Sequence, residues 1–186
     1  MIKRTIDIFF SLLFLFISSP IFFIIIIIIY FSDSSVFFYS KRIGKNSKIF
    51  LMPKFKTMKD DSPNLATDVL KNPEKYYTKF GSFLRRFSLD EIPQFFCILS
   101  GEMSIVGPRP ALFNQYTLIE KRKELGIDSL KPGITGLAQI SGRDKLSTDQ
   151  KVYYDNEYLK NNNILIDIQI IIKTPFKVIR GTDVKS

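Results

Sequence analysis

A long apolar segment near the N-terminus dominates the hydrophobic pattern of the chain. Residues 8–31 carry no charge, and only Ser11, Ser18, Ser19 and Pro20 interrupt the otherwise apolar and aromatic run. As a straight helix this segment would be roughly 36 Å long at about 1.5 Å per residue, enough to cross the hydrocarbon core of a bilayer. It is also too long for the apolar region of a signal peptide. The pattern therefore predicts a membrane helix.

Pro20 lies near the middle of this helix, where it removes one backbone hydrogen bond and crowds the carbonyl of Phe16. The hydroxyls of Ser18 and Ser19 can satisfy backbone groups that are freed inside lipid. Lysine and arginine residues flank the segment on both sides, so the positive-inside rule places both ends in the cytoplasm. A helix that enters the bilayer, breaks at Ser19-Pro20 and returns would satisfy both flanks. A kinked spanning helix is the alternative that the residues leave open.

After this helix the pattern becomes that of a globular domain, so we expect a membrane helix over residues 1–33 and a membrane-associated domain over 34–186. Short apolar stretches around a basic turn predict strands, a polar stretch with prolines predicts a loop over 60–73, and longer periodic stretches predict helices. The expected fold class is mixed α/β and rich in helix. The predicted strands cover 36–39 and 49–52, and the predicted helices cover 76–86, 92–99, 114–125 and 149–160.

The last apolar stretch, residues 164–179, is interrupted by Asp167, Gln169, Lys173 and Lys177. This spacing predicts an amphipathic helix at the membrane interface. A helix that packs its apolar side into the core is the alternative with the same pattern.

Charge and composition narrow the possible chemistry. The chain has 27 Lys and Arg against 18 Asp and Glu, a net charge of +9, which suits an anionic partner such as acidic lipid, nucleic acid or a phosphorylated substrate. It contains one cysteine, Cys97, which excludes an intrachain disulfide, and no histidine, which excludes histidine-based triads and metal sites. Catalysis would rest on carboxylates, Lys, Ser, Tyr or Cys97.

Two adjacent carboxylates, Asp90 and Glu91, form the densest candidate cluster, behind Arg85 and Arg86. Ser88-x-x-Glu91 matches a capping box, which gives Glu91 a purely structural interpretation. Asp90 is not needed by that motif. Near a helix N-terminus and two arginines we expect its ionised form to be favoured, as suits a nucleophile or a metal ligand.

A second cluster places Arg109 between Pro108 and Pro110. Because each proline restrains the residue before it, the loop is stiff and presents one guanidinium, a good bidentate phosphate ligand. A rigid turn with a solvated arginine is the alternative. Arg143, in Ser-Gly-Arg-Asp, is a third loop arginine and carries little weight alone.

Three long motifs occur in order: SLDEIPQ at residues 88–94, GEMSIVGPRP at 101–110, and PGITGLAQ at 132–139 followed by SGR at 141–143. With the Ser19-Pro20 break and the Tyr154-Asp155-x-x-Tyr158 stretch, they cover nearly the whole chain. This set resembles the bacterial sugar transferase family, and more closely its small monotopic phosphoglycosyl transferases.

The resemblance implies a re-entrant N-terminal helix and a catalytic domain on the cytoplasmic face of the bacterial inner membrane. It implies that Asp90 attacks the sugar-proximal phosphorus of a UDP-sugar, releases UMP, and passes the phosphosugar to undecaprenyl phosphate. Glu91 would assist, and Mg²⁺ bound near Asp90 would balance phosphate charge. The resemblance also implies substrate or phosphate contacts for a set of residues, and glycosyltransferases of the same pathway as further partners. The set comprises Arg85, Pro108, Arg109, Pro110, Arg143 and Lys56.

Four positions depart from the family pattern: Cys97 replaces a usual Asn, Ser47 a Gly, Lys56 an Arg and Leu137 a Trp. None touches the carboxylate pair. The competing functional hypothesis is a non-catalytic membrane scaffold for glycan-assembly enzymes, which would have no use for the carboxylates or Arg109. A nucleic-acid-binding protein fits less well, because no nucleic-acid motif is present. The sequence leaves the identity of the sugar open.

Overall fold

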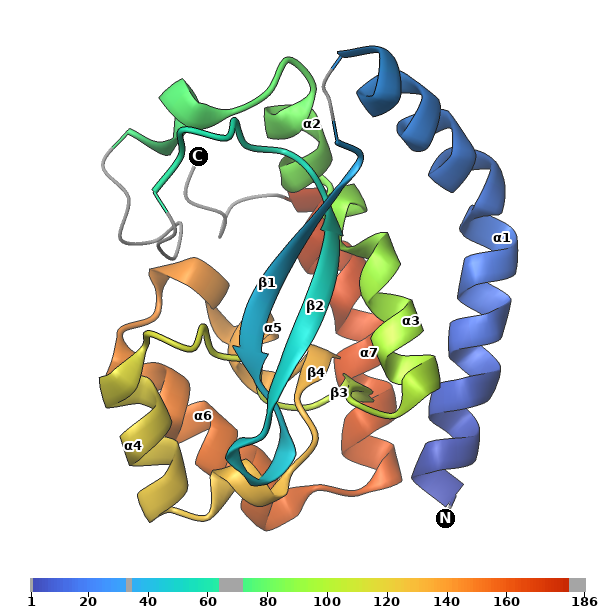
Figure 1. The fold of residues 1–186 in the computed structure, drawn as a ribbon. Helices are drawn as coiled ribbons and strands as arrows, with labels where there is room; N and C mark the ends of the chain where they lie inside the picture. Colours follow the sequence, from blue (N-terminus) through green and yellow to red (C-terminus); the bar gives the residue numbers. More distant parts are fainter. Residues whose placement is uncertain (1, 33–34, 64–71, 181–186) are drawn as a thin grey trace.

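The structure, a computed structural model, describes residues 2–32, 35–63 and 72–180. Most of the loop predicted over 60–73 therefore lies outside the described residues, as do the junction at 33–34 and the end of the predicted second domain. A long helix, α1 (Ile2–Ser32), runs along one side of a globular body built from two small sheets and several helices (Figure 1).

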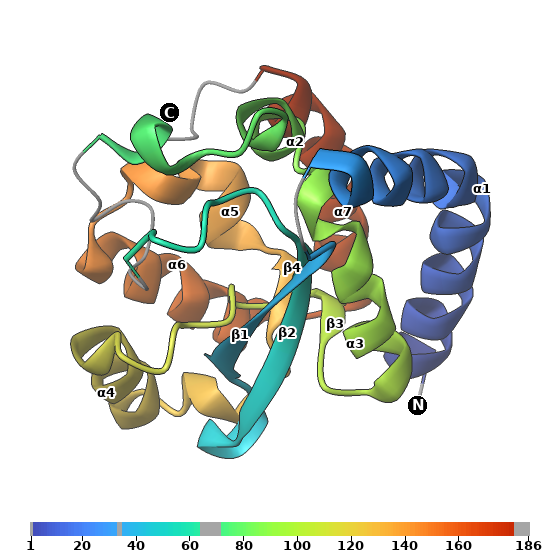
Figure 2. The same cartoon turned by 45° about the horizontal axis from the view of Figure 1, so that its top comes forward.

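Helix α1 contains Pro20 without losing its helical assignment, but it changes direction along its length (Figure 2). Ser19 Oγ donates a hydrogen bond of 2.8 Å to the carbonyl of Phe16, the acceptor that the proline leaves without a backbone donor. The serine therefore does what its position predicts. Within the described ranges α1 alone is long and apolar enough to cross a membrane, with a mean hydropathy of 3.1 over its best window.

Both halves of α1 pack against the same body. In the first half, Phe14 stacks on Phe95 with ring centroids 4.2 Å apart. In the second half, Ile25 and Ile29 are buried in a cluster that includes Phe55. The rest of the helix surface exposes large apolar side chains, as expected of a helix that faces lipid.

The first sheet is an antiparallel hairpin of β1 (Phe37–Ile43) and β2 (Ile49–Phe55), in which Phe37 pairs with Phe55. The two predicted strands are thus confirmed in type but are longer than predicted. Side chains alternate along β2, so Phe50, Met52 and Lys54 share one face. The first two are buried in the core, and this alternation carries Lys54 inward as well.

The second sheet pairs β3 (Ser104–Val106) with β4 (Gly133–Thr135) in parallel. Their backbones approach so closely that side chains are excluded. A Cβ on Gly107 would lie 2.3 Å from the Lys131 carbonyl oxygen, and one on Gly133 would lie 2.1 Å from the Gly107 nitrogen. The segment that follows β3 is therefore held by backbone contact.

The predicted helices are confirmed with shifted bounds. Residues 76–86 form a helix only at their end, and residues 92–99 begin as a 3₁₀ turn because Pro93 lies inside it. A capping box is formed by Ser147 and Gln150 at the N-terminus of the helix over Thr148–Asn161. The observed helices are η2 (Pro73–Tyr76), α2 (Gly81–Arg86), η3 (Leu89–Gln94), α3 (Phe95–Ser100), α4 (Tyr116–Glu124), η4 (Ile127–Ser129), α5 (Leu137–Ser141), η5 (Arg143–Lys145), α6 (Thr148–Asn161) and α7 (Ile164–Arg180).

Helix α7 is amphipathic, as predicted, and it also packs against the core, while its place at a membrane interface stays a prediction. One side packs into the core, where Ile170 is fully buried with Ile98 and Met103. The opposite side exposes an apolar stripe, in which Leu165, Ile172 and Phe176 are each more than half exposed. An amphipathic helix with an unpaired apolar side is therefore present.

Candidate active site

A cavity of about 420 Å³ lies where the hairpin, η3 and the loop after β3 meet. Its lining is strongly cationic, which suits a ligand with several negative charges. The basic residues in the lining are Arg42, Lys54, Lys56, Lys59, Arg85, Arg109, Arg122, Arg143 and Lys151, and the acidic ones are Asp60, Asp90, Glu91 and Asp144.

Glu91 is a buried carboxylate held by two partly buried cations. Its carboxylate accepts hydrogen bonds from both terminal nitrogens of Arg109, at 2.5 and 3.4 Å, and one from Lys54 Nζ at 2.9 Å. Burial opposes the ionisation of Glu91, but Arg109, Lys54 and more distant Arg143 outweigh it and hold its pKa well below the usual range. The charge of Glu91 is thus already neutralised by the protein.

Asp90 lies in a different environment although it is the adjacent residue. It is 4% exposed, and Lys54 Nζ lies 3.6 Å from its Oδ2, too far for a good hydrogen bond. Burial raises its pKa above the usual value, and the nearby charge of Glu91 adds to this, against Lys54, Arg85 and Arg143. The sequence led us to expect neighbouring cations to favour the ionised form, but the direction of the shift is upward, because the loss of hydration exceeds the attraction of the cations.

The capping box predicted for this helix is also absent. Ser88 has a left-handed backbone conformation (φ 54°) and caps no backbone N–H group with its side chain. Its hydroxyl instead accepts a hydrogen bond of 3.2 Å from Arg143. Glu91 points to Arg109 and Lys54, so the structural interpretation of Glu91 fails and both carboxylates face the cavity lining.

Two further basic residues of the cavity come from the hairpin and were missed in the sequence. Lys54 contacts both carboxylates, and burial lowers its pKa although Glu91 and Asp90 act in the opposite direction. Arg42 donates to the carbonyl of Pro110 at 3.1 Å, and burial together with Arg109 lowers its pKa to about 9. Longer strand predictions with strict alternation would have indicated that Lys54 points inward.

Arg122 and Asp155 form a second missed pair, which supports the loop of Arg109 from behind. Arg122 donates through Nε and Nη2 to Asp155 Oδ2, at 2.9 and 2.6 Å, and through Nη1 to the carbonyl of Arg109 at 2.8 Å. Burial raises the pKa of Asp155, and Arg122 opposes this shift. The pair joins helices α4 and α6 to the Pro-Arg-Pro loop.

All but one of the site residues predicted from the sequence line this cavity: Asp90, Glu91, Arg85, Arg109, Pro110, Arg143 and Lys56. Pro108 instead lines a smaller depression on the other side of the loop. Lys56 Nζ pairs with Asp60 Oδ1 at 2.9 Å. Arg85 packs over the ring of Tyr77, 5.3 Å from its centroid.

A divalent cation would find few protein ligands here. The described residues contain no cluster of three or more Cys, His, Asp or Glu side chains that could hold one. Of the adjacent pair, Glu91 is engaged by two cations, and Asp90 is the carboxylate that could bind a metal ion. Mg²⁺ commonly binds through one or two carboxylates together with substrate phosphates and water, so the donor set fits Mg²⁺ that arrives with a phosphorylated substrate.

Comparison with known proteins places the chain in a family. The family model described as "Bacterial sugar transferase" matches residues 1–181. The exopolysaccharide production protein ExoY of Sinorhizobium fredii is 38% identical over 92% of this chain and 83% of its own length. The undecaprenyl-phosphate galactose phosphotransferase of Salmonella typhimurium is 34% identical over 96% of this chain. The UDP-glucose:undecaprenyl-phosphate glucose-1-phosphate transferase of Escherichia coli is 38% identical over 95% of it.

The chain spans about 40% of the length of the last two relatives. The match to the family nevertheless includes α1, both carboxylates and every arginine of the cavity. The chain belongs to the bacterial sugar transferase family.

Proposed function

We propose that this chain transfers a sugar 1-phosphate from a UDP-sugar to undecaprenyl phosphate, with release of UMP, as the first membrane step of a surface glycan pathway. The names of its relatives support the two substrates. The observation that carries the proposal is the difference between the paired carboxylates. Glu91 is neutralised by Arg109 and Lys54, whereas Asp90 faces a cationic cavity and, among the residues that the structure describes, accepts no hydrogen bond from an arginine. The scaffold hypothesis is not favoured, because it gives this arrangement no role.

In the proposed mechanism an Asp90 oxygen attacks the sugar-proximal phosphorus of the UDP-sugar. The bond from that phosphorus to the bridging oxygen breaks, and UMP leaves with the electron pair. A phosphate oxygen of undecaprenyl phosphate then attacks the phosphosugar on Asp90, forms the diphosphate-linked product and restores the carboxylate. Burial favours the attack, because the oxygen has already lost most of its water.

The cationic residues would position the diphosphate and compensate its charge, which is the main requirement of phosphoryl transfer. Arg109 is fixed by Glu91 through its side chain and by Arg122 through its carbonyl. Arg85, Arg143 and Lys56 line the same cavity. Mg²⁺, when bound at Asp90 with the diphosphate, would supply further charge neutralisation.

We also propose that α1 enters the inner membrane from the cytoplasmic face and returns to the same face, so that both of its ends are cytoplasmic. Both halves of α1 pack on one globular body, which supports two ends on one side of the bilayer. The change of direction of α1 and the apolar stripe of α7 would let the body rest on the interface.

The test is UMP release by the full chain in nanodiscs, with a panel of UDP-sugars beginning with UDP-glucose and UDP-galactose. We expect release that depends on undecaprenyl phosphate for multiple turnovers, and a phosphosugar on Asp90 detectable by intact-protein mass spectrometry. Asp90→Asn should show neither. Turnover by Asp90→Asn within about tenfold of wild type would exclude the covalent mechanism.

A further inference from the structure

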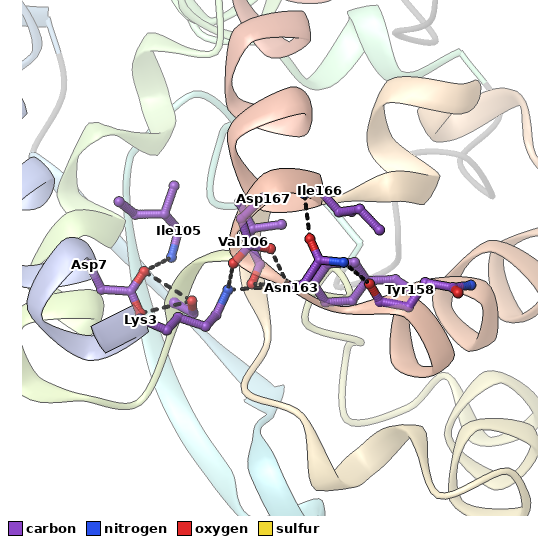
Figure 3. A network of polar contacts seen from close by, with 10 residues as sticks. Lys3, Asp7, Ile105, Val106, Tyr158, Asn163, Ile166 and Asp167 are labelled. Carbon is purple, nitrogen blue, oxygen red and sulfur yellow. Dashed lines mark hydrogen bonds and ion pairs between the residues drawn. The ribbon is translucent and has the colours of Figure 1, made fainter. Parts of the chain in front are cut away.

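The first two turns of α1 carry a buried carboxylate, Asp7, that the proposed reaction does not use. Asp7 is 4% exposed, and its two oxygens lie 3.1 and 2.9 Å from Ser104 Oγ. Oδ1 also accepts a hydrogen bond of 3.0 Å from the backbone nitrogen of Ile105 (Figure 3). Burying a carboxylate is costly unless its hydrogen bonds are satisfied, and Ser104 and Ile105 satisfy those of Asp7. Anchoring a helix in a membrane does not by itself require such a contact.

Further polar contacts surround the same strand. The Tyr158 hydroxyl lies 2.6 Å from Asp167 Oδ1 and 3.3 Å from the carbonyl of Val106, and it accepts a hydrogen bond of 3.1 Å from Lys3 Nζ (Figure 3). Lys3 also pairs with Asp167. Segments from the beginning, middle and end of the chain therefore meet at β3.

Arg4, in the same turn of α1, makes a different connection. Its guanidinium donates to the carbonyls of Ile98 and Leu99 at the end of α3, the latter at 2.8 Å. The head of α1 is thus attached at two places. Asp7 is attached to the strand β3, and Arg4 is attached to a helix end.

Strand β3 leads directly into the loop of Arg109, and this path is stiff. Gly107 N donates to the Thr135 carbonyl and Gly133 N to the Pro108 carbonyl, both at 2.9 Å. The close backbone approach at Gly107 leaves no room to absorb a shift, and prolines precede and follow Arg109. A displacement of β3 would therefore move the guanidinium that binds Glu91.

We propose that Asp7 is a positioning residue for Arg109, acting through β3, so that the contact of Asp7 with Ser104 and Ile105 is required for an active site. The proposal rests on the function proposed above only for its kinetic test. It makes the membrane helix part of the catalytic scaffold in addition to an anchor.

The kinetic test compares Asp7→Ala, Asp7→Asn and the matched control Arg4→Ala in nanodiscs. Asp7→Ala should lower kcat by about tenfold or more with a smaller change in KM, since a misplaced arginine weakens the transition state. Asp7→Asn should restore most of the rate, because an amide can accept from Ile105 N and donate to Ser104 Oγ. Arg4→Ala should retain kcat within about threefold, with equal membrane association.

A double-mutant cycle then identifies the route of the effect. In an Arg109→Ala background, Asp7→Ala should change kcat by less than about twofold, because residues that act through one another are not additive. Full additivity, or an equal loss of kcat in Arg4→Ala, would overturn the positioning role and leave Asp7 as a general support of the fold.

Amide hydrogen exchange on the full chain measures the effect of the contact between Asp7 and β3 without any substrate. Asp7→Ala should increase exchange at Ile105 and Gly107, while Arg4→Ala should leave both protected. Unchanged protection at these two amides in Asp7→Ala would overturn the inference whatever the activity of the chain. Absence of UMP release with altered exchange would instead count against the proposed function alone.

Discussion

Arg109 donates hydrogen bonds from both terminal nitrogens to the carboxylate oxygens of Glu91, at 2.5 and 3.4 Å, and donates none to Asp90, the residue beside it. The protein therefore gives two adjacent carboxylates opposite environments. Burial raises the pKa of Asp90, whereas Arg109 and Lys54 hold that of Glu91 well below its usual range despite burial. Two adjacent substitutions should consequently have opposite effects on stability.

Asp90→Asn should raise the melting temperature at pH 7, because it removes a charge whose burial is only partly offset by Lys54, 3.6 Å away. Glu91→Gln should lower it, with a loss of about 3–5 kcal/mol typical of a broken buried ion pair. Both variants remove one negative charge from neighbouring positions, so each is the control for the other. Thermal unfolding in the same nanodiscs with EDTA measures the difference, and a stabilised Glu91→Gln would contradict the assignment of the pair.

The pH dependence of the two effects follows from the same shifts. A depressed folded pKa means that Glu91 contributes stability above its unfolded pKa of about 4.3, and that this contribution is lost as pH falls through the folded value. The raised folded pKa of Asp90 has the opposite sign, so its penalty develops as pH rises from about 4. The advantage of Asp90→Asn over wild type should accordingly shrink to nothing near pH 4. A melting-temperature difference that is constant from pH 4 to 8 would contradict this sign.

Much of this arrangement could be predicted from the sequence. Apolar spacing gave α1, the amphipathic α7 and both hairpin strands in type, and the motif residues Asp90, Glu91 and Arg109 do meet at one cavity. Local patterns failed where tertiary contacts decide the outcome. Ser88-x-x-Glu91 matches a capping box, but Glu91 gains more from two partly buried cations than from a backbone amide.

The contacts of Asp7 and of Arg122 with Asp155 could not be read from spacing at all. Asp7 and Ser104 are 97 positions apart, and Arg122 and Asp155 are 33 apart. Pairing over such separations is set by how the helices pack, and a single sequence contains no local signal for it.

Arg109→Lys should separate charge from geometry. A lysine keeps the positive charge but cannot bridge both Glu91 and a phosphate with a planar fork. We expect kcat/KM to fall about tenfold or more, equivalent to about 1.4 kcal/mol. Steady-state UMP release measures it, with Lys59→Arg as a control for a basic cavity residue outside this pair. A fully active Arg109→Lys would mean that the fork is not used.

Replacing Pro20 should test whether the proline causes α1 to change direction. A leucine restores the backbone N–H at position 20, which can donate to the Phe16 carbonyl in place of the Ser19 hydroxyl. A straight helix then becomes available. A cysteine is added at the N-terminus of two chains, one with Pro20 and one with Pro20→Leu. We expect a membrane-impermeant maleimide in the periplasm to label this cysteine partly in Pro20→Leu and not at all in the chain that keeps Pro20. Cys97 should not interfere, because it is buried and burial raises its thiol pKa to about 12. Periplasmic labelling of the added cysteine in the chain that keeps Pro20 would contradict the re-entrant topology.

The contact between the backbones of Gly107 and Gly133 has a consequence for protein engineering. A Cβ on either glycine would overlap the other strand, so neither segment can be exchanged for a bulkier sequence independently. A loop of Arg109 transplanted from a relative would therefore have to be transferred together with the facing strand, as residues 104–110 and 131–136. The unit that holds Arg109 in place is therefore discontinuous in the gene.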